Sequence, residues 1–116
     1  MNIETKKTGT ALIARVKGKL DAVTAPDFEK TFLDLLAGGE QQLLVNFAEL
    51  EYISSAGLRS VLVAAKHAKQ HNVKLLFTDL RGLVLEVFTL SGFVSILAVA
   101  PTEAEGLRLI GGNAAK

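Results

Sequence analysis

The chain contains no cysteine, so it can form neither a disulfide framework nor a thiolate metal site, and a reducing cytoplasm is the compartment we expect. It also lacks long apolar runs. Residues 1–7 are too polar for a signal peptide, and the longest apolar run, 93–100, has the length of a strand and not of a membrane span. The net charge of +1 provides no basic excess for nucleic acid. We therefore expect a cytoplasmic protein that binds neither membranes nor nucleic acid.

The length and composition of the chain fit one compact domain. The 116 residues are 49% hydrophobic and 22% charged, which is enough apolar material for one core and leaves no room for a second domain. We expect the folded domain to cover residues 1–110. The glycine-containing end, 111–116, is expected to be a flexible C-terminal tail.

Hydrophobic periodicity and turn residues predict an alternation of strands and helices. The predicted elements, in chain order, are a hairpin of strands 2–7 and 11–16, a loop 18–23, a helix from Thr24 to about Ala37, a strand 43–47, a turn into a helix that ends at Asn72, a strand 73–78, a helix 82–91, a strand 94–99, and a short final helix capped by Thr102 and interrupted by Gly106.

The order of these elements predicts the fold class. From residue 43 onward strands alternate with helices, which requires parallel pairing through crossover helices, whereas the opening hairpin is antiparallel. We therefore predict an α/β domain with a mixed central sheet of about four or five strands and three or four helices.

A pair of serines, Ser54 and Ser55, lies where a predicted strand leads into a predicted helix. A serine hydroxyl caps a helix by accepting a hydrogen bond from a first-turn amide, and one serine is sufficient for this. The second would lie at the positive end of the helix dipole, where free amides and the dipole both favour a phosphate. From the residues alone, two readings stay open: a capped helix without chemistry, and a phosphorylated serine.

The residues around this pair resemble a family signature. Ser54-Ser55-Ala56-Gly57-Leu58 is similar to the Asp-Ser-Ser/Ala/Thr-Gly-Leu motif of the STAS domain of bacterial anti-sigma factor antagonists. The segments Gly18–Pro26 and Leu85–Phe93 resemble two further segments of that family. The alignment puts Ser55 at the position that is phosphorylated in the family, and it puts Ser54 where most members have aspartate. The resemblance implies the same α/β layout.

The resemblance also implies a function. The unphosphorylated chain would bind an anti-sigma factor serine kinase and so release a sigma factor, phosphorylation of Ser55 would abolish this binding, and a serine phosphatase would restore it. The chain would be a substrate and ligand of these partners, not an enzyme, and would need no cofactor. A homodimer stays open. The predicted partner-binding residues are Asp21, Thr24, Ser54, Ser55, Ala56, Gly57, Leu58 and Arg59.

Three of these assignments have structural alternatives. Asp21 is expected in a loop near Ser55 by the resemblance, although carboxylates are common turn residues. Thr24 is either a contact or only the cap of the following helix, and we favour the cap. Arg59 follows Ser55 by four residues and could reach a phosphate along one helical face, or it could be an ordinary exposed arginine.

Other functions have weaker support in the sequence. His67 and His71 have the spacing of two metal ligands on a helix but lack a third, so we predict no metal site. The glycines form no nucleotide-binding fingerprint, although weak nucleotide binding stays open, as does a constitutive scaffold role in a larger complex. Asn46 is expected to close hydrogen bonds at a strand end. The basic group of Lys66, His67, Lys69 and Lys74 is interpreted as a solvated surface.

Overall fold

The computed structural model describes residues 1–110, which form a mixed α/β domain with six strands and five helices. The elements are β1 (Asn2–Thr8), β2 (Ala11–Leu20), α1 (Ala25–Ala37), β3 (Gln42–Asn46), β4 (Leu50–Ile53), α2 (Ser55–Gln70), β5 (Lys74–Thr78), α3 (Gly82–Leu90), α4 (Phe93–Ile96), β6 (Val99–Ala100) and α5 (Glu103–Ile110). The predicted fold class is confirmed, with one strand and one helix more than the predicted ranges. The predicted tail, 111–116, lies outside the described residues.

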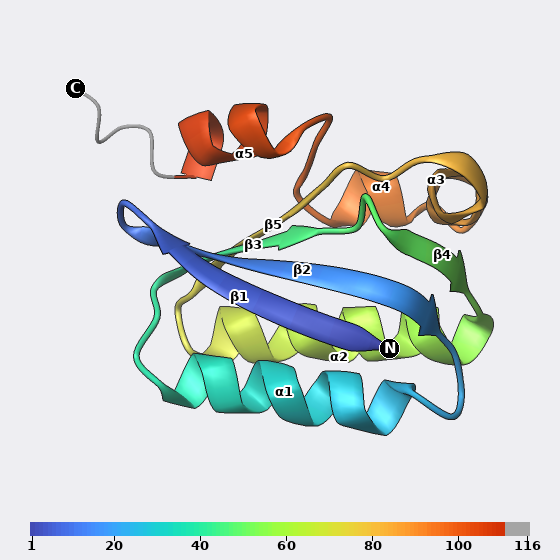
Figure 1. The fold of residues 1–116 in the computed structure, drawn as a ribbon, viewed down its shortest axis with the longest axis horizontal. Coiled ribbons are helices and arrows are strands. Elements are labelled where there is room, and N and C mark those ends of the chain that lie inside the picture. Colours follow the sequence, from blue (N-terminus) through green and yellow to red (C-terminus); the bar gives the residue numbers. More distant parts are fainter. Residues whose placement is uncertain (111–116) are drawn as a thin grey trace.

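The sheet is mixed, as the element order predicted. Its strands follow the order β1-β2-β3-β5-β6, and β4 pairs with the far end of β2. The β1–β2 hairpin is antiparallel and every other pairing is parallel, because α1 and α2 carry the chain back across the sheet. These two helices cover one face of the sheet, and α5 lies on the opposite face (Figure 1).

The core has two parts because alternate strand residues point to opposite faces. In β2, Leu12, Ala14 and Val16 belong to the larger cluster, which also contains buried residues of α1, α2 and α3. Ala11 and Ile13 belong to a smaller cluster beneath α5. The larger cluster includes an aromatic group in which the rings of Phe47, Phe77 and Phe88 lie with their centroids 5.6 to 6.3 Å apart.

The predicted loop 18–23 was wrong at its beginning. β2 continues to Leu20 because residues 18–20 pair with β4, a strand that the sequence did not predict. β4 has four residues, of which only the first and last are buried, so it shows no alternation that could have revealed it.

The predicted strand 94–99 was also wrong. The chain turns at Gly92, whose φ is 81°, and forms the short helix α4, closed by the bond from the Leu97 amide to the Phe93 carbonyl. Only Val99 and Ala100 pair with the sheet. A short apolar run does not distinguish a helix from a strand, which explains the error.

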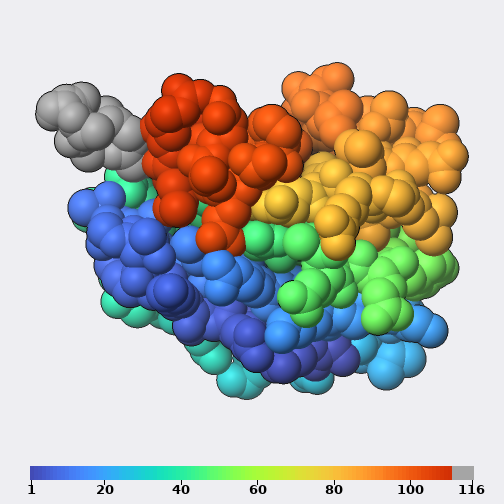
Figure 2. All heavy atoms as spheres, turned by 45° about the horizontal axis from the view of Figure 1, so that its top comes forward, coloured from blue at the N-terminus to red at the C-terminus, as the bar shows by residue number. Residues whose placement is uncertain are grey.

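The final helix is capped as predicted, because the amide of Glu105 donates to Thr102 Oγ1 at 3.1 Å. The predicted interruption at Gly106 was wrong. Gly106 lies within α5 and is buried against the sheet, where an added Cβ would come within 2.6 Å of Thr78 Cγ2 and 2.8 Å of Leu44 Cδ1. The absence of a side chain therefore lets α5 pack closely on β3 and β5 (Figure 2 shows α5 in red).

Replacing Gly106 with alanine should lower the free energy of unfolding by about 1–3 kcal/mol, because the methyl overpacks this contact. The loss should occur although alanine favours helix formation over glycine by about 1 kcal/mol. Urea denaturation measures it. Gly38→Ala, at the end of α1, is the matched control, since its added Cβ meets neighbouring atoms no closer than 3.4 Å. Equal stability of both variants would contradict the close packing of α5.

Candidate functional site

The two serines have different places at the start of α2. Ser54 is the N-cap: its backbone is extended, with φ −96° and ψ 177°, and its Oγ accepts from the amide of Gly57 at 3.1 Å. Ser55 is the first residue of the helix and is exposed. Its hydroxyl makes no hydrogen bond with residues 1–110. The prediction that one serine caps the helix is therefore confirmed, and the other is left accessible.

The electrostatic setting of Ser55 suits an anion. It lies at the N-terminus of a 16-residue helix, where the helix dipole is positive, and the first turn contains no acidic residue. The family aspartate would place a carboxylate next to Ser55, whereas Ser54 caps the helix without adding charge. A phosphate at Ser55 would therefore gain from the dipole and meet no repulsion from the first turn of α2.

The loop between β2 and α1 lies beside this helix start. Leu20 pairs with Ile53, and the Leu20 carbonyl accepts from the amide of Ser54 at 3.0 Å. Asp21 follows Leu20 directly. The structure thus brings the end of β2 and the loop 21–24 next to the serine pair, as the resemblance implied, although the two segments are more than 30 residues apart in the sequence.

Asp21 organises its own loop. Its Oδ1 accepts from the amides of Val23 at 3.0 Å and Thr24 at 3.2 Å. The bond from the Thr24 amide, joined by that from Val23, outweighs partial desolvation and holds the pKa of Asp21 below its ordinary value. Oδ2 makes no bond with residues 1–110. The lowered pKa favours the charged carboxylate, and one of its two oxygens is left without a bond to residues 1–110.

Thr24 is the N-cap residue of α1, as favoured, and its carbonyl accepts from the amide of Phe28 at 3.1 Å. The expected capping bond of its hydroxyl was wrong, because the side chain forms none. Its hydroxyl instead accepts from the Asp21 amide and donates to the Lys19 carbonyl, both at 2.9 Å. The Thr24 hydroxyl is used in the turn that contains Asp21. It therefore accepts no hydrogen bond from the first-turn amides of α1.

The other predicted partner-binding residues differ in how far they are exposed to solvent. Arg59 is exposed and forms no ion pair with residues 1–110, Ala56 is half-buried, and Leu58 is half-buried against the core. Gly57 is buried and supports the site from beneath: an added Cβ would lie 2.4 Å from the Leu20 carbonyl oxygen. Because Gly57 has no side chain, the first turn of α2 can lie close to the end of β2.

Two exposed apolar residues near the serine pair were not predicted from the sequence. Val23, at the tip of the 21–24 loop, is 84% exposed, and Tyr52, two residues before Ser54, is 40% exposed. Exposed apolar side chains beside accessible polar ones are typical of protein-binding surfaces. Val23 is the one large apolar side chain in the 21–24 loop, and this is the sequence signal that could have revealed it.

Replacing Ser54 with alanine should lower the free energy of unfolding by about 1 kcal/mol, because the Gly57 amide loses its acceptor. Replacing Ser54 with aspartate should restore the lost stability, since aspartate caps helices as well as serine does. Thermal or urea denaturation measures both. If Ser54→Ala were as stable as the wild type, the assignment of Ser54 as the cap would be contradicted.

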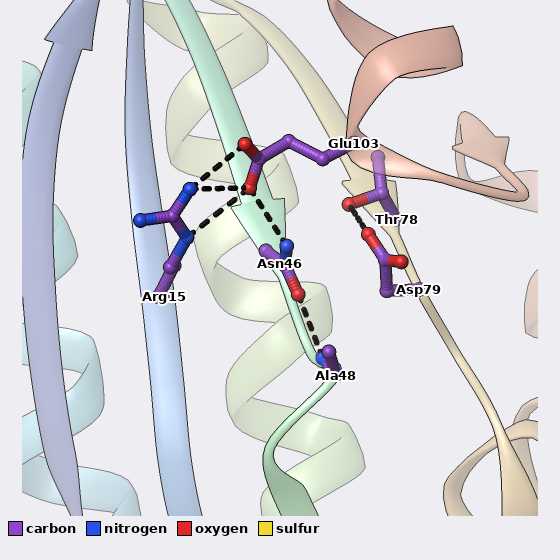
Figure 3. A network of polar contacts seen from close by, with 6 residues as sticks. All are labelled: Arg15, Asn46, Ala48, Thr78, Asp79 and Glu103. Carbon is purple, nitrogen blue, oxygen red and sulfur yellow. Dashed lines mark hydrogen bonds and ion pairs between the residues drawn. The ribbon is translucent and has the colours of Figure 1, made fainter.

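A polar network on the other side of the sheet joins α5 to the strands (Figure 3). Arg15 Nη2 lies 2.8 Å from Glu103 Oε2, and Asn46 Nδ2 donates to Glu103 Oε1 at 2.8 Å. Asn46 Oδ1 accepts from the amide of Ala48 at 2.7 Å, which confirms that Asn46 closes hydrogen bonds at a strand end. The network fixes the start of α5 above β2 and β3.

This network makes stability depend on pH. Partial burial raises the pKa of Glu103, but the hydrogen bonds from Arg15 and Asn46, with the charge of Arg15, outweigh it and hold the pKa below the ordinary value of 4.5. The ionised carboxylate therefore stabilises the fold above about pH 4.5, and this contribution is lost as the pH falls through the lowered folded pKa.

Glu103→Gln should therefore be less stable than the wild type at about pH 7, and the difference should shrink towards about pH 3, as the wild-type carboxylate takes up protons. Urea denaturation at both pH values measures the difference. Glu86→Gln, at an exposed position in α3 without an ion pair in residues 1–110, is the control and should match the wild type. A difference that stays constant with pH would contradict the role of the carboxylate.

The structure also describes the histidine pair and the lengths of the helices. His71 Nδ1 lies 2.8 Å from the His67 carbonyl oxygen, and residues 1–110 contain no group of three His, Cys, Asp or Glu side chains arranged to hold a metal. None of the described helices is both long and apolar enough to span a membrane.

Comparisons with known proteins agree with the fold and with the predicted family. The family model of the STAS domain matches residues 2–106. BtrV of Bordetella bronchiseptica, provisionally named an anti-sigma factor antagonist, is 37% identical over 100 residues, which are 86% of each chain.

Solved structures share the fold. An anti-sigma factor antagonist from Mycobacterium paratuberculosis has a TM-score of 0.84 at 19% identity, over 94% of this chain and 92% of that one. The anti-sigma factor antagonist SpoIIAA in its unphosphorylated form has a TM-score of 0.78 at 19% identity, over 96% and 97%. The phosphorylated form of the Bacillus cell fate determinant SpoIIAA has a TM-score of 0.69 at 19% identity, over 94% and 99%.

Proposed function

The chain belongs to the STAS domain family, and from this premise we propose that it is an anti-sigma factor antagonist of a partner-switching system. In its unphosphorylated form it binds an anti-sigma factor serine kinase, which then releases its sigma factor. The kinase transfers the terminal phosphoryl group of ATP to Ser55 Oγ and leaves ADP, and binding is lost. A serine phosphatase hydrolyses the phosphoserine and restores the binding form.

The observation that carries this proposal is the division of roles between the two serines. Ser54 makes the capping bond, so Ser55 is not needed to hold the helix and its hydroxyl is accessible to a kinase. The names of the relatives support the partner class, since BtrV and SpoIIAA are both named as antagonists of anti-sigma factors, and SpoIIAA has been solved with and without phosphate.

The switch acts at the surface and not through the fold. Phosphorylation adds a charge of about −1.5 to −2 at a helix N-terminus, where the dipole favours it, so the domain stays folded. A partner that packs on this helix start must desolvate that charge, and like charges across an interface cost several kcal/mol. The proposed contact surface consists of Asp21, Val23, Tyr52, Ser55, Leu58 and Arg59.

A sigma-release assay tests the function. Each serine-kinase anti-sigma factor of the host is purified in complex with its sigma factor, and the unphosphorylated chain is added without ATP. For one of these pairs the sigma factor should be released in proportion to added chain. With ATP present, release should stop as Ser55 becomes phosphorylated. Failure to release any sigma factor would contradict the proposal.

A constitutive scaffold subunit is the alternative, and Ser54 in place of the family aspartate favours it. In that case the complexes formed by the chain would be the same with serine or alanine at residue 55, and the motif would serve only through the Ser54 cap of α2.

A further inference from the structure

Arg59 shares one exposed face of α2 with Ser55. The exposed residues of this helix are Ser55, Arg59, Lys66, Lys69 and Gln70, and their spacing places them on one side of it. Arg59 follows Ser55 by four residues, so the two side chains are neighbours, with Cβ atoms about 5–6 Å apart. Because helical side chains lean toward the N-terminus, the guanidinium of Arg59 can extend over the turn that begins with Ser55.

The charge of Arg59 has no partner within the described residues. Arg59 forms no ion pair with residues 1–110, and the first turn of α2 contains no acidic residue that could compete for it. Ser54 adds no charge where most family members have aspartate. The next lysine or arginine along the helix is Lys66, about three turns from Ser55 and therefore about 16 Å away along the axis. A phosphate on Ser55 would thus have Arg59 as the nearest cation of its own helix.

Charged and titratable residues of the neighbouring segments also act on the start of α2. They are Lys19 and Asp21 at the end of β2, Glu51 and Tyr52 of β4, and Asp27, Glu29 and Lys30 of α1, which packs against α2 (Figure 1). Acids raise the pKa of a nearby phosphate and cations lower it. Lys19 lies close enough to Asp21 to interact with its charge. Lys30 pairs with Asp34 at 3.3 Å. Arg59 is therefore the cation that is left for the phosphate.

We propose that Arg59 binds the phosphate of phosphorylated Ser55 in an ion pair on this face of α2. The inference rests on the proposed phosphorylation of Ser55 and adds what the phosphate does on the chain itself. A guanidinium can donate two parallel hydrogen bonds to phosphate oxygens, whereas a lysine ammonium acts as a point charge. Because the pair is exposed, its contribution to stability is modest and is screened by salt.

The pair gives phosphorylation a second effect on the contact surface. In the unphosphorylated chain, the guanidinium of Arg59 is free to meet an acidic group of the kinase. In the phosphorylated chain, its donors are turned to the phosphate on Ser55. The kinase then meets an added negative charge and also loses a cation to which it could bind, and both changes weaken the complex.

A phosphorus NMR titration tests this inference without the kinase. The full chain is produced with phosphoserine incorporated at residue 55 during translation, and the pKa of the phosphate, ordinarily about 6, is measured. A nearby cation favours the dianion, so the Arg59→Gln variant should have a titration midpoint about 0.5 pH unit higher than the wild type. Lys66→Gln removes the same charge from the same helix face and should leave the midpoint unchanged, because Lys66 lies beyond the Debye length of about 8 Å.

Further measurements distinguish a specific ion pair from the general field of the protein. Arg59→Lys keeps the charge but lacks the planar donors, so it should restore only part of the change in midpoint. Lys19→Gln removes a cation at the same end of the molecule and should have a smaller effect than Arg59→Gln. In the ¹⁵N-labelled wild type, the Nε–H resonance of Arg59 should shift when residue 55 is phosphoserine, and it should move back at high salt.

Three outcomes would overturn the inference: the same midpoint in the wild type and Arg59→Gln, an equal change in Lys19→Gln, or an Arg59 Nε–H resonance that phosphoserine leaves in place. Each of them would leave partner switching intact, because a phosphate without a bound arginine still adds charge to the contact surface. Conversely, a host in which Ser55 is never phosphorylated would contradict the proposed function and would not alter the titration result.

Discussion

Replacing Ser55 with aspartate is expected to weaken binding to the anti-sigma factor kinase by about 100-fold or more, while the free energy of unfolding changes by about 0.5 kcal/mol or less. The carboxylate lies at the positive end of α2, where it is tolerated, but a partner packed on the exposed residue must desolvate it. Isothermal titration calorimetry measures the affinity, and urea denaturation measures the stability.

Two variants at the same residue isolate the charge. Ser55→Asn has the shape of aspartate without its charge and should keep most of the affinity, and Ser55→Ala should bind as the wild type does. If Ser55→Asp bound the kinase as tightly as Ser55→Asn, charge at this residue would not control binding, and the switch would be contradicted.

Replacing Gly57 with alanine should cause the largest loss of stability, about 3 kcal/mol. The added Cβ would lie 2.4 Å from the Leu20 carbonyl oxygen and 2.9 Å from Ile53 Cγ1. That oxygen accepts the Ser54 amide, and Leu20 pairs with Ile53 of β4, so it cannot move without breaking these bonds. The start of α2 would have to move away from β2, and kinase binding should fall too.

Ala56→Gly is the neighbouring control for this prediction. It removes a methyl from a half-buried residue of the same helical turn and should cost about 1 kcal/mol or less. Urea denaturation compares the two variants. A Gly57→Ala protein as stable as the wild type, with kinase binding intact, would contradict the close approach of α2 to β2.

Much of the fold could be predicted because most elements show regular periodicity. In α1, Phe28, Phe32 and Leu36 recur every four residues and are buried as a stripe. β4 could not be predicted, because Glu51 and Tyr52 between its two buried ends are both exposed. α4 and β6 divide an apolar run whose length and composition also fit a single strand.

The candidate site was only partly predictable for a related reason. The cap at Ser54 depends on residues three apart, which a sequence shows directly. The burial of Gly57 and Gly106 depends on which distant segment comes close to each helix, and the Arg15–Glu103 pair joins residues 88 apart. Thr24 is the N-cap residue, but the bonding of its hydroxyl was assigned wrongly, because the hydroxyl takes part in a turn that only the folded loop reveals.

The central claim is that Ser55 carries a reversible phosphate, and intact mass with phosphopeptide mapping of the protein purified from its own host tests it most directly. The account predicts a species about 80 Da heavier, the mass of one phosphate, with the modification on Ser55 and not on Ser54, which disappears after phosphatase treatment. An unmodified Ser55 under growth, stress and starvation would contradict the switch and leave only the helix cap at Ser54.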